Sequence, residues 1–163
     1  MDDFVDSKKC VRTEHKLIFH SPIPCIAMSV PIMIEKVRFE KSVADSILTY
    51  ALGSYPKEAI LLIRGKAERN MIFIKDVLIP PLATHGLGFS GFSNIMLPMD
   101  LSIMGTSDSH PSGSLQPSIH DLNHFYGKIM IITAYPFQNY NDIGVFDSHG
   151  QKIPHEVLAN DDV

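Results

Sequence analysis

The sequence predicts a single mixed α/β domain, and three features of the chain support this fold class. The chain has 163 residues, of which 45% are hydrophobic and 20% are charged, a composition typical of a globular domain. Residues 42–53 have the spacing of an amphipathic helix. Several short segments rich in Val, Ile and Leu lie on either side of this helix and predict strands.

The first predicted elements are a strand and the helix that follows it. Residues 30–37 alternate loosely between apolar and polar side chains, a pattern typical of a strand. In the helix, Ser42 is the expected N-cap and Gly53 the expected C-terminal glycine. The expected apolar face consists of Val43, Ala44, Ile47, Leu48 and Ala51.

Further strands are predicted by apolar segments in the middle of the chain. Residues 59–63 form a continuous apolar run, typical of a strand buried on both faces, which residues 64–66 are expected to end. Residues 71–79 predict the next strand and residues 101–105 a later one. Residues 84–93, rich in Gly and Ser, are expected to form a mobile loop, and loops of this length are often functional.

The remainder of the chain predicts a loop, a helix, a strand and a hairpin. Residues 108–117 contain prolines, a glycine and serines, which are typical of a loop. Residues 118–126 predict a helix, and residues 128–135 predict a strongly β-prone strand. Residues 143–153 predict a hairpin that turns at residues 148–150.

We expect the domain to span residues 30–155 of the chain. An N-terminal extension over residues 1–29 and a C-terminal tail over residues 156–163 are expected to flank it.

Charge and cysteine content exclude several classes of function. The net charge is −4, and no Lys/Arg cluster is longer than Lys8 and Lys9, which argues against a nucleic-acid surface. Cys10 and Cys25 are too few for a disulfide scaffold or a four-cysteine zinc site. No apolar run approaches the roughly 18 residues that suggest a membrane span, and the acidic residues 1–6 argue against a secretory signal. We therefore expect a cytoplasmic protein that does not bind membranes.

The residues with the most chemistry lie in two places in the chain. Asp108, His110 and Asp121 are all candidate metal ligands. One residue separates Asp108 from His110, so both side chains lie on one side of an extended segment. Asp121 falls in the first turn of the predicted second helix. Glu58 lies at the start of a buried strand, where a carboxylate is costly unless it is paired or functional.

This arrangement resembles the JAMM/MPN metalloprotease family. Residues 55–62 resemble the family's Pro-x-Glu segment, and residues 105–111 are similar to its Gly-x-x-His-Ser-His-Pro segment. Residues 117–121 match its Pro-Ser-x-x-Asp segment, with ten residues between His110 and Asp121 as in the family. Several motifs at fixed spacing are more specific than one short motif.

The resemblance covers about residues 30–153 and implies a fold, a metal and residue roles. The fold is the MPN (JAB-like) α/β domain, a curved mixed β-sheet flanked by helices. The family's zinc ion is held by two histidines, one aspartate and a water molecule, which implies His110 and Asp121 as ligands. The resemblance also implies that Glu58 accepts and passes on the proton of a water molecule, and that Ser118 donates a hydrogen bond to the oxyanion.

Asp108 departs from the family pattern, because it stands where the family has its first histidine ligand. With Asp108 as a ligand, the zinc centre would be neutral instead of carrying one positive charge, and would acidify water less. Aspartate is also shorter than histidine, although carboxylate is an accepted zinc ligand. An oxygen-rich site would also suit manganese. Alternatively, Asp108 is a loop aspartate that bonds to its own turn.

The resemblance implies a zinc-dependent isopeptidase or peptidase that releases ubiquitin or a ubiquitin-like modifier from lysine. Two alternatives remain open at this point. One is a metal-free, inactive MPN domain that acts as a scaffold or protein-binding module. The other is a hydrolase of small amide or carbamate substrates. Dimerisation between MPN domains is a further open expectation.

Each candidate residue also has a structural interpretation. Ser118 and Asp121 have the spacing of a capping box at a helix start. Glu58 could be a salt-bridge partner at the edge of a strand. His120 and His124 have the i, i+4 spacing of a metal-binding helix pair, but a solvated helix face also explains them. His124 could also lean toward the metal that Asp121 holds.

Overall fold

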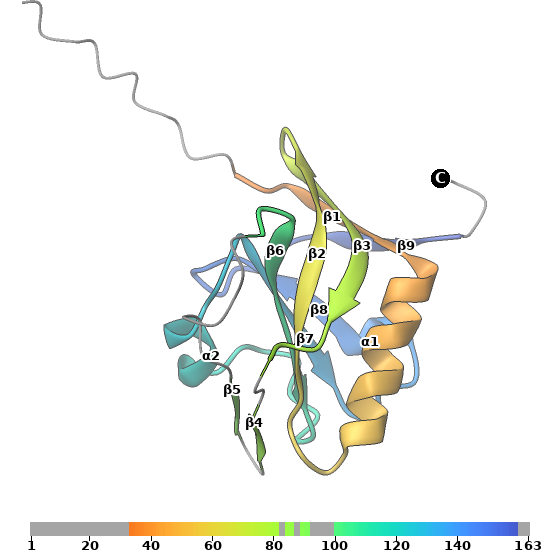
Figure 1. The fold of residues 1–163 in the computed structure, drawn as a ribbon, viewed down its shortest axis with the longest axis vertical. Helices are drawn as coiled ribbons and strands as arrows, with labels where there is room; N and C mark the ends of the chain where they lie inside the picture. The colour runs from red at the N-terminus through yellow and green to blue at the C-terminus, as the bar shows by residue number, and fades with distance from the viewer. Residues whose placement is uncertain (1–32, 82–83, 87–88, 92–99, 160–163) are drawn as a thin grey trace, which may run out of the picture. The chain divides into compact units, whose positions relative to one another are not determined.

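The computed structural model describes residues 33–81, 84–86, 89–91 and 100–159, which all belong to the compact unit Pro31–Val163 (Figure 1). A seven-stranded sheet forms its centre, in the order β8-β7-β6-β2-β3-β1-β9. Its strands are β1 (Lys36–Glu40), β2 (Ile60–Glu68), β3 (Met71–Leu78), β6 (Ile103–His110), β7 (Ile129–Ala134), β8 (Ile143–Phe146) and β9 (His155–Leu158). The described helices are α1 (Lys41–Ser54), α2 (Ile119–Asn123) and the short 3-10 helix η2 (Tyr140–Asp142).

The sheet is mixed, and this confirms the predicted α/β class. β1 runs parallel to β3 and β9, and β6 runs parallel to β7. β2 runs antiparallel to both β3 and β6, and β8 runs antiparallel to β7. In the part of the chain that the structure describes, no helix is both long and apolar enough to span a membrane.

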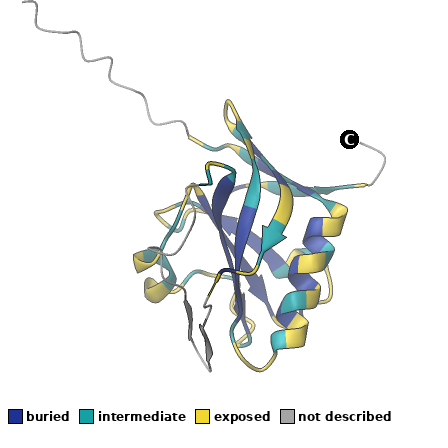
Figure 2. Cartoon of the chain, in the orientation of Figure 1, coloured by how far each residue is buried: buried dark blue, intermediate teal, exposed yellow. Residues whose placement is uncertain are grey.

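Helix α1 covers one face of the sheet with the predicted apolar stripe (Figure 2). All five predicted residues, Val43, Ala44, Ile47, Leu48 and Ala51, are buried. They join one core cluster with inward residues of the sheet such as Phe39, Ile72 and Ile131. Burial of a large apolar side chain of this kind contributes about 1.5–3 kcal/mol.

The ends of α1 differ from the prediction. The N-cap is Glu40, without a side-chain capping bond, because β1 passes directly into the helix. Gly53 lies inside the helix, which continues to Ser54. Pro56 follows the C-cap Tyr55, and a proline disfavours the helical conformation of the residue before it.

The predicted end of β2 at residues 64–66 is wrong, because the strand continues to Glu68. Its register shifts between Arg64 and Gly65, which is a β-bulge. A Cβ atom at Gly65 would lie 2.1 Å from the backbone oxygen of Phe73. The glycine therefore allows a close approach of two strands and does not terminate one of them.

The predicted loop over residues 108–117 is also wrong in its first part. β6 continues to His110, so Asp108 and His110 are strand residues and the loop begins after them. The expected loop over residues 84–93 contains β4 (Thr84–Gly86) and β5 (Phe89–Gly91), which pair as an antiparallel two-stranded sheet. The remaining residues of that loop lie outside the described ones.

Other predicted boundaries differ by a few residues. The first strand is shifted toward the C-terminus, to Lys36–Glu40, and the second helix ends at Asn123. The N-terminal extension over residues 1–29 lies outside the described residues. The expected boundary between residues 155 and 156 falls inside β9, and the division into domains stays a prediction.

Candidate active site

A cavity of about 270 Å³ lies where β2 begins, β6 ends and α2 begins. Nine residues line it: Glu58, His110, Ser112, Ser114, Gln116, Pro117, Ser118, His120 and Asp121. Glu58, His110, Ser118 and Asp121, four of the five site residues predicted from the sequence, are among them. The rest of the lining comes mainly from the loop that joins β6 to α2.

His110 is the last residue of β6, and its imidazole faces a carboxylate. Its Nδ1 lies 3.0 Å from the carbonyl oxygen of Ser114, and its Nε2 lies 3.3 Å from Oδ2 of Asp121. A carbonyl only accepts, so Nδ1 carries the proton and donates it to Ser114. In the neutral ring, the lone pair on Nε2 then faces an acceptor oxygen. The arrangement needs a cation between them, either a proton on Nε2 or a metal ion.

Asp121 is held in place by a capping box at the start of α2. Its Oδ2 accepts the backbone N–H of Ser118 at 2.6 Å, and its own N–H donates to Oγ of Ser118 at 3.1 Å. The structural interpretation of this pair is therefore confirmed. The same Oδ2 faces His110, so the cap also orients the carboxylate toward the cavity.

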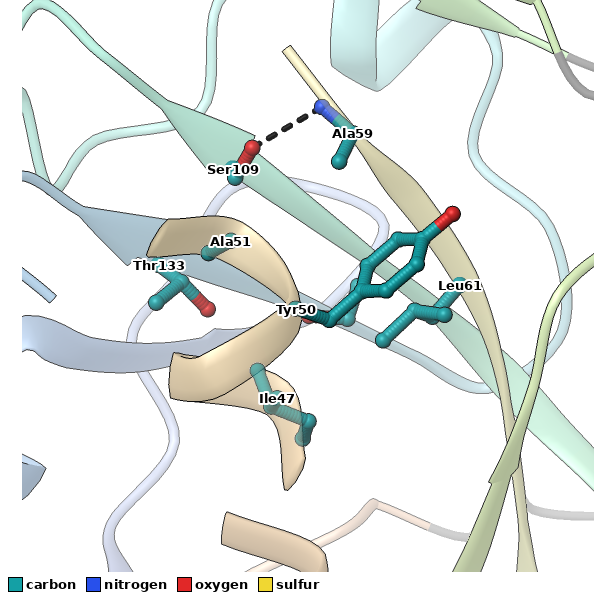
Figure 3. A pocket seen from close by; sticks show the side chains of 8 residues that line it. Ile47, Tyr50, Ala51, Ala59, Leu61, Ser109 and Thr133 are labelled. Carbon is teal, nitrogen blue, oxygen red and sulfur yellow. Dashed lines mark hydrogen bonds between the residues drawn. The ribbon is translucent and has the colours of Figure 1, made fainter. Parts of the chain in front are cut away.

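Glu58 precedes β2, and hydrogen bonds of the next residue, Ala59, hold this segment against the end of β6. The N–H of Ala59 donates to Oγ of Ser109 at 2.8 Å (Figure 3). The N–H of Ser109 donates to the carbonyl of Ala59 at 2.9 Å. Because Ala59 follows Glu58 and Ser109 precedes His110, the two bonds set the position of Glu58 relative to His110.

Burial, hydrogen bonds and neighbouring charges shift the pKa values of the titratable groups in the cavity. Burial raises the pKa of the Glu58 carboxyl, and His110 opposes the rise. Burial lowers the pKa of His110, but the hydrogen bond and the charge of Asp121 raise it more, so it lies above the ordinary value. Burial raises the pKa of Asp121, but bonds from His110 and Ser118 lower it more, so this carboxyl stays ionised at lower pH than usual.

Comparison with known proteins places this chain in a family. No protein-family model matches the chain. A protein of Haloferax volcanii named "Probable metalloprotease" is 30% identical over 134 residues, which cover 78% of this chain and 83% of that protein. The structure described as "JAMM: A Metalloprotease-like Zinc Site in the Proteasome and Signalosome" matches with a TM-score of 0.54 and 26% identity, covering 78% of this chain and 100% of that one. The chain belongs to the JAMM/MPN family.

Two further structures support the fold of this JAMM/MPN domain. A JAB1/MPN domain protein from Archaeoglobus fulgidus matches with a TM-score of 0.53 and 25% identity, over 76% of this chain and 99% of that one. A protein from Desulfitobacterium hafniense shares the fold at 13% identity, with a TM-score of 0.51, over 76% of this chain and 94% of that one. The predicted MPN (JAB-like) fold, with its curved mixed sheet, is thus confirmed.

Asp108 is the predicted site residue of this JAMM/MPN domain that does not line the cavity. It is buried in β6, where it pairs with Ile60 on one side and Ile132 on the other. Strand residues paired directly in register share a face of the sheet, so two isoleucines flank the carboxylate. Within the described ranges, no three His, Cys, Asp or Glu side chains are grouped so as to hold one metal ion.

The donor atoms present could supply two of the ligands of one zinc ion. Imidazole nitrogen and carboxylate oxygen are both zinc ligands. Two such atoms on one tetrahedral zinc ion are about 3.4 Å apart, and Nε2 of His110 and Oδ2 of Asp121 are 3.3 Å apart. The bond from Nδ1 to the Ser114 carbonyl is also the outer contact that fixes the tautomer of a ligating histidine. His110 and Asp121 would therefore hold the ion, and the third protein ligand is not in place.

Sequence reasoning missed two features of the site. The Ser114 carbonyl that orients His110 is a backbone group, and side-chain patterns do not reveal it. The sequence feature that could have indicated this contact is Gly113. Its φ of +79° allows the turn that returns the chain to His110. The sequence offers His120 either as half of a metal-binding pair with His124 or as part of a solvated helix face; it is exposed, but it also lines the cavity.

Proposed function

We propose that this chain is a JAMM-type, zinc-dependent peptidase or isopeptidase that releases a ubiquitin-like modifier from a lysine side chain. One observation carries the proposal. Nε2 of His110 and Oδ2 of Asp121, two groups that would repel each other unless a cation lay between them, face each other across 3.3 Å. They do so in a cavity that Glu58 also lines.

The metal would be held by His110 and Asp121. When bound, it would contribute acidification of a water molecule and polarisation of the scissile carbonyl. The Ser118 and Ser114 contacts would keep both ligands in the orientation that binding needs.

Glu58 is the proposed proton carrier. A general base works best when its pKa lies near the working pH, and burial raises the pKa of Glu58 in that direction. Ionised, it accepts a proton from water at a carboxylate oxygen. Protonated, it delivers that proton to the leaving lysine amine.

Ser118 is the proposed oxyanion donor. Its Oγ accepts the N–H of Asp121, and that bond does not use the hydroxyl proton. The side chain also lines the cavity. The hydroxyl can therefore donate to the oxygen that becomes negative when the carbonyl is attacked, a contribution typically of about 3 kcal/mol to the barrier.

The substrate class rests on the family. The cavity that would receive the scissile bond has a volume of about 270 Å³. The expected partners are ubiquitin-like proteins or their conjugates, with no nucleic acid. The cytoplasmic location and dimerisation between MPN domains also stay predictions.

A second candidate is a metal-free MPN scaffold. It is favoured by the position of Asp108, which is buried between two isoleucines and does not line the cavity. In this case the bond between His110 and Asp121 would be an ordinary ion pair with the imidazole protonated.

Metal content and cleavage together separate the two candidates. The protein is purified without chelator, zinc per chain is measured by mass spectrometry, and cleavage of a lysine-linked ubiquitin dimer is followed with and without 1,10-phenanthroline. About one zinc per chain and cleavage that phenanthroline abolishes are expected. A folded chain that neither retains zinc at saturating concentration nor cleaves would instead support the scaffold.

A further inference from the structure

We propose that His120 is the third protein ligand of the zinc site, beside His110 and Asp121. This inference rests on the proposed function, since it assigns a ligand to the metal of that same site. It places a second neutral imidazole next to the single carboxylate of Asp121.

The need for a third ligand follows from zinc chemistry. Catalytic zinc sites use three protein ligands and keep a fourth position for water or substrate. His110 and Asp121 supply two. Among the residues that line the cavity, the only other side chains of a zinc-binding type are those of His120 and Glu58.

Asp108 is poorly placed to supply the third ligand. It lies two residues before His110, about 6.7 Å back along the strand, and its carboxylate is short. Its side chain is only 8% exposed and already has an interaction partner in the fold. To reach the cavity, the carboxylate would have to leave that partner and pass the two isoleucines that flank it.

Glu58 is a weaker choice than His120 on electrostatic grounds. A second carboxylate ligand would place a like charge beside Asp121 in the same cavity. A neutral imidazole adds a donor atom without adding charge. With His120 bound, the zinc centre keeps one positive charge, which favours acidification of water.

His120 is also free to move in a way that Asp108 is not. His120 directly precedes Asp121 in α2, and its side chain is exposed. Its ring lies 4.3 Å from that of His124 and outside the hydrophobic core. Exposed side chains change rotamer in picoseconds to nanoseconds. Because this ring lies outside the core, its rotation toward the metal position costs no core packing. This rotation is the movement that the third contact requires.

His124 provides a matched control for His120. His124 is the C-cap of α2, four residues after His120, and the two exposed rings lie against each other. Nδ1 of His124 lies 2.9 Å from the carbonyl oxygen of His120, so that nitrogen donates to the backbone. His124 does not line the cavity.

Zinc affinity is measured by competition with a chromophoric chelator at pH 7.5. The proteins are the parent, His120→Ala, His124→Ala and Asp108→Asn, each checked for folding by circular dichroism. Loss of a residue that only orients a ligand costs about 10–100-fold in affinity, so loss of a ligand should cost more than about 100-fold. We expect this loss for His120→Ala, and no change above threefold for the other two variants. Added imidazole should recover part of the affinity of His120→Ala.

A second readout does not depend on activity or affinity. The visible absorption of bound cobalt(II) reports the number and type of its ligands. The spectrum should change for His120→Ala and stay the same for His124→Ala. A parent that binds zinc, together with full affinity in His120→Ala and loss in Asp108→Asn, overturns the inference and leaves the proposed function standing. A parent that binds no zinc overturns both.

Discussion

The hydroxyl oxygen of Ser109 accepts the backbone N–H of Ala59 at 2.8 Å, and this bond links the residue before β2 to the end of β6 (Figure 3). Both residues are buried, at 3% and 2% exposure, so the N–H has no water to replace the hydroxyl. On one side of the bond lies Glu58, the proposed proton carrier, and on the other lies His110. The spacing of Glu58 and His110 thus depends on the hydroxyl of Ser109, which does not line the candidate active-site cavity.

Ser109→Ala should therefore affect stability and rate together. The change leaves a buried N–H without its acceptor, which typically costs about 1–3 kcal/mol of the free energy of unfolding. We also expect a lower kcat with unchanged zinc affinity, because His110 and Asp121 are untouched. Urea unfolding and single-turnover cleavage measure the two effects.

Ser107→Ala is the matched control for Ser109→Ala. Ser107 lies two residues earlier in β6, is equally buried at 3% exposure, and lines the same small cavity under α1, but it does not accept the Ala59 N–H. If Ser107→Ala lowered kcat as much as Ser109→Ala, the bond to Ala59 would not be what positions Glu58.

Glu58→Gln should lower the rate of cleavage without loss of metal. Glutamine keeps the size of the side chain and its hydrogen bonds but cannot accept the proton, and loss of a general base typically costs about 10²–10⁴-fold. Lys57→Gln, an exposed neighbour, serves as the control. Cleavage by Glu58→Gln at the parent rate would show that another group takes the proton.

The stability of the metal-free protein should also respond to Glu58→Gln, with a defined pH dependence. The folded pKa of Glu58 is raised above its unfolded value, so the ionised form is penalised in the folded state. The penalty is absent below the unfolded pKa of about 4.3 and is complete above the folded pKa. We expect Glu58→Gln to be more stable than the parent at pH 7 in chelator, and this gain to vanish near pH 4. A gain that persists unchanged at pH 4 would have another cause.

How much of this site the sequence predicts depends on the residue. The inward face of α1 follows from its periodicity, because the helix packs by that face alone. The sequence predicts β6 only in part, since the polar run from Gly105 to His110 has weak strand character. Its neighbours β2 and β7 supply backbone hydrogen bonds on both sides and override that local preference. The motif spacing predicts that His110 and Asp121 lie close together. The burial of Asp108 away from the cavity depends on where the cavity opens, and strand alternation does not encode this.

His155, which does not line the cavity, should make the fold less stable in mild acid. It pairs with Val37 at the edge of the sheet, and its ring meets that of Phe39 edge-on at 5.7 Å. Burial, with Lys152 nearby, lowers the pKa of His155 in the folded state. The unfolded chain therefore binds a proton more readily, so this contribution to stability is complete above the unfolded pKa of about 6.5 and falls as the pH drops below it. Urea unfolding between pH 8 and pH 5 should show a shallower decline for His155→Gln than for the parent.

Asp108→His tests the third-ligand position by supplying an imidazole from β6, whereas His120→Ala removes one from α2. Imidazole is longer than carboxylate and would extend from β6 along the face that also carries His110, toward the cavity. Placed in the parent, it competes with His120 for one position, so zinc affinity should change little. Placed in a His120→Ala background, it should recover most of the lost affinity, because it returns a second imidazole and the single positive charge of the centre. Chelator competition on the four proteins of this double-variant cycle measures the coupling between the two positions. Independent effects of Asp108→His and His120→Ala would mean that the two side chains never serve the same metal position.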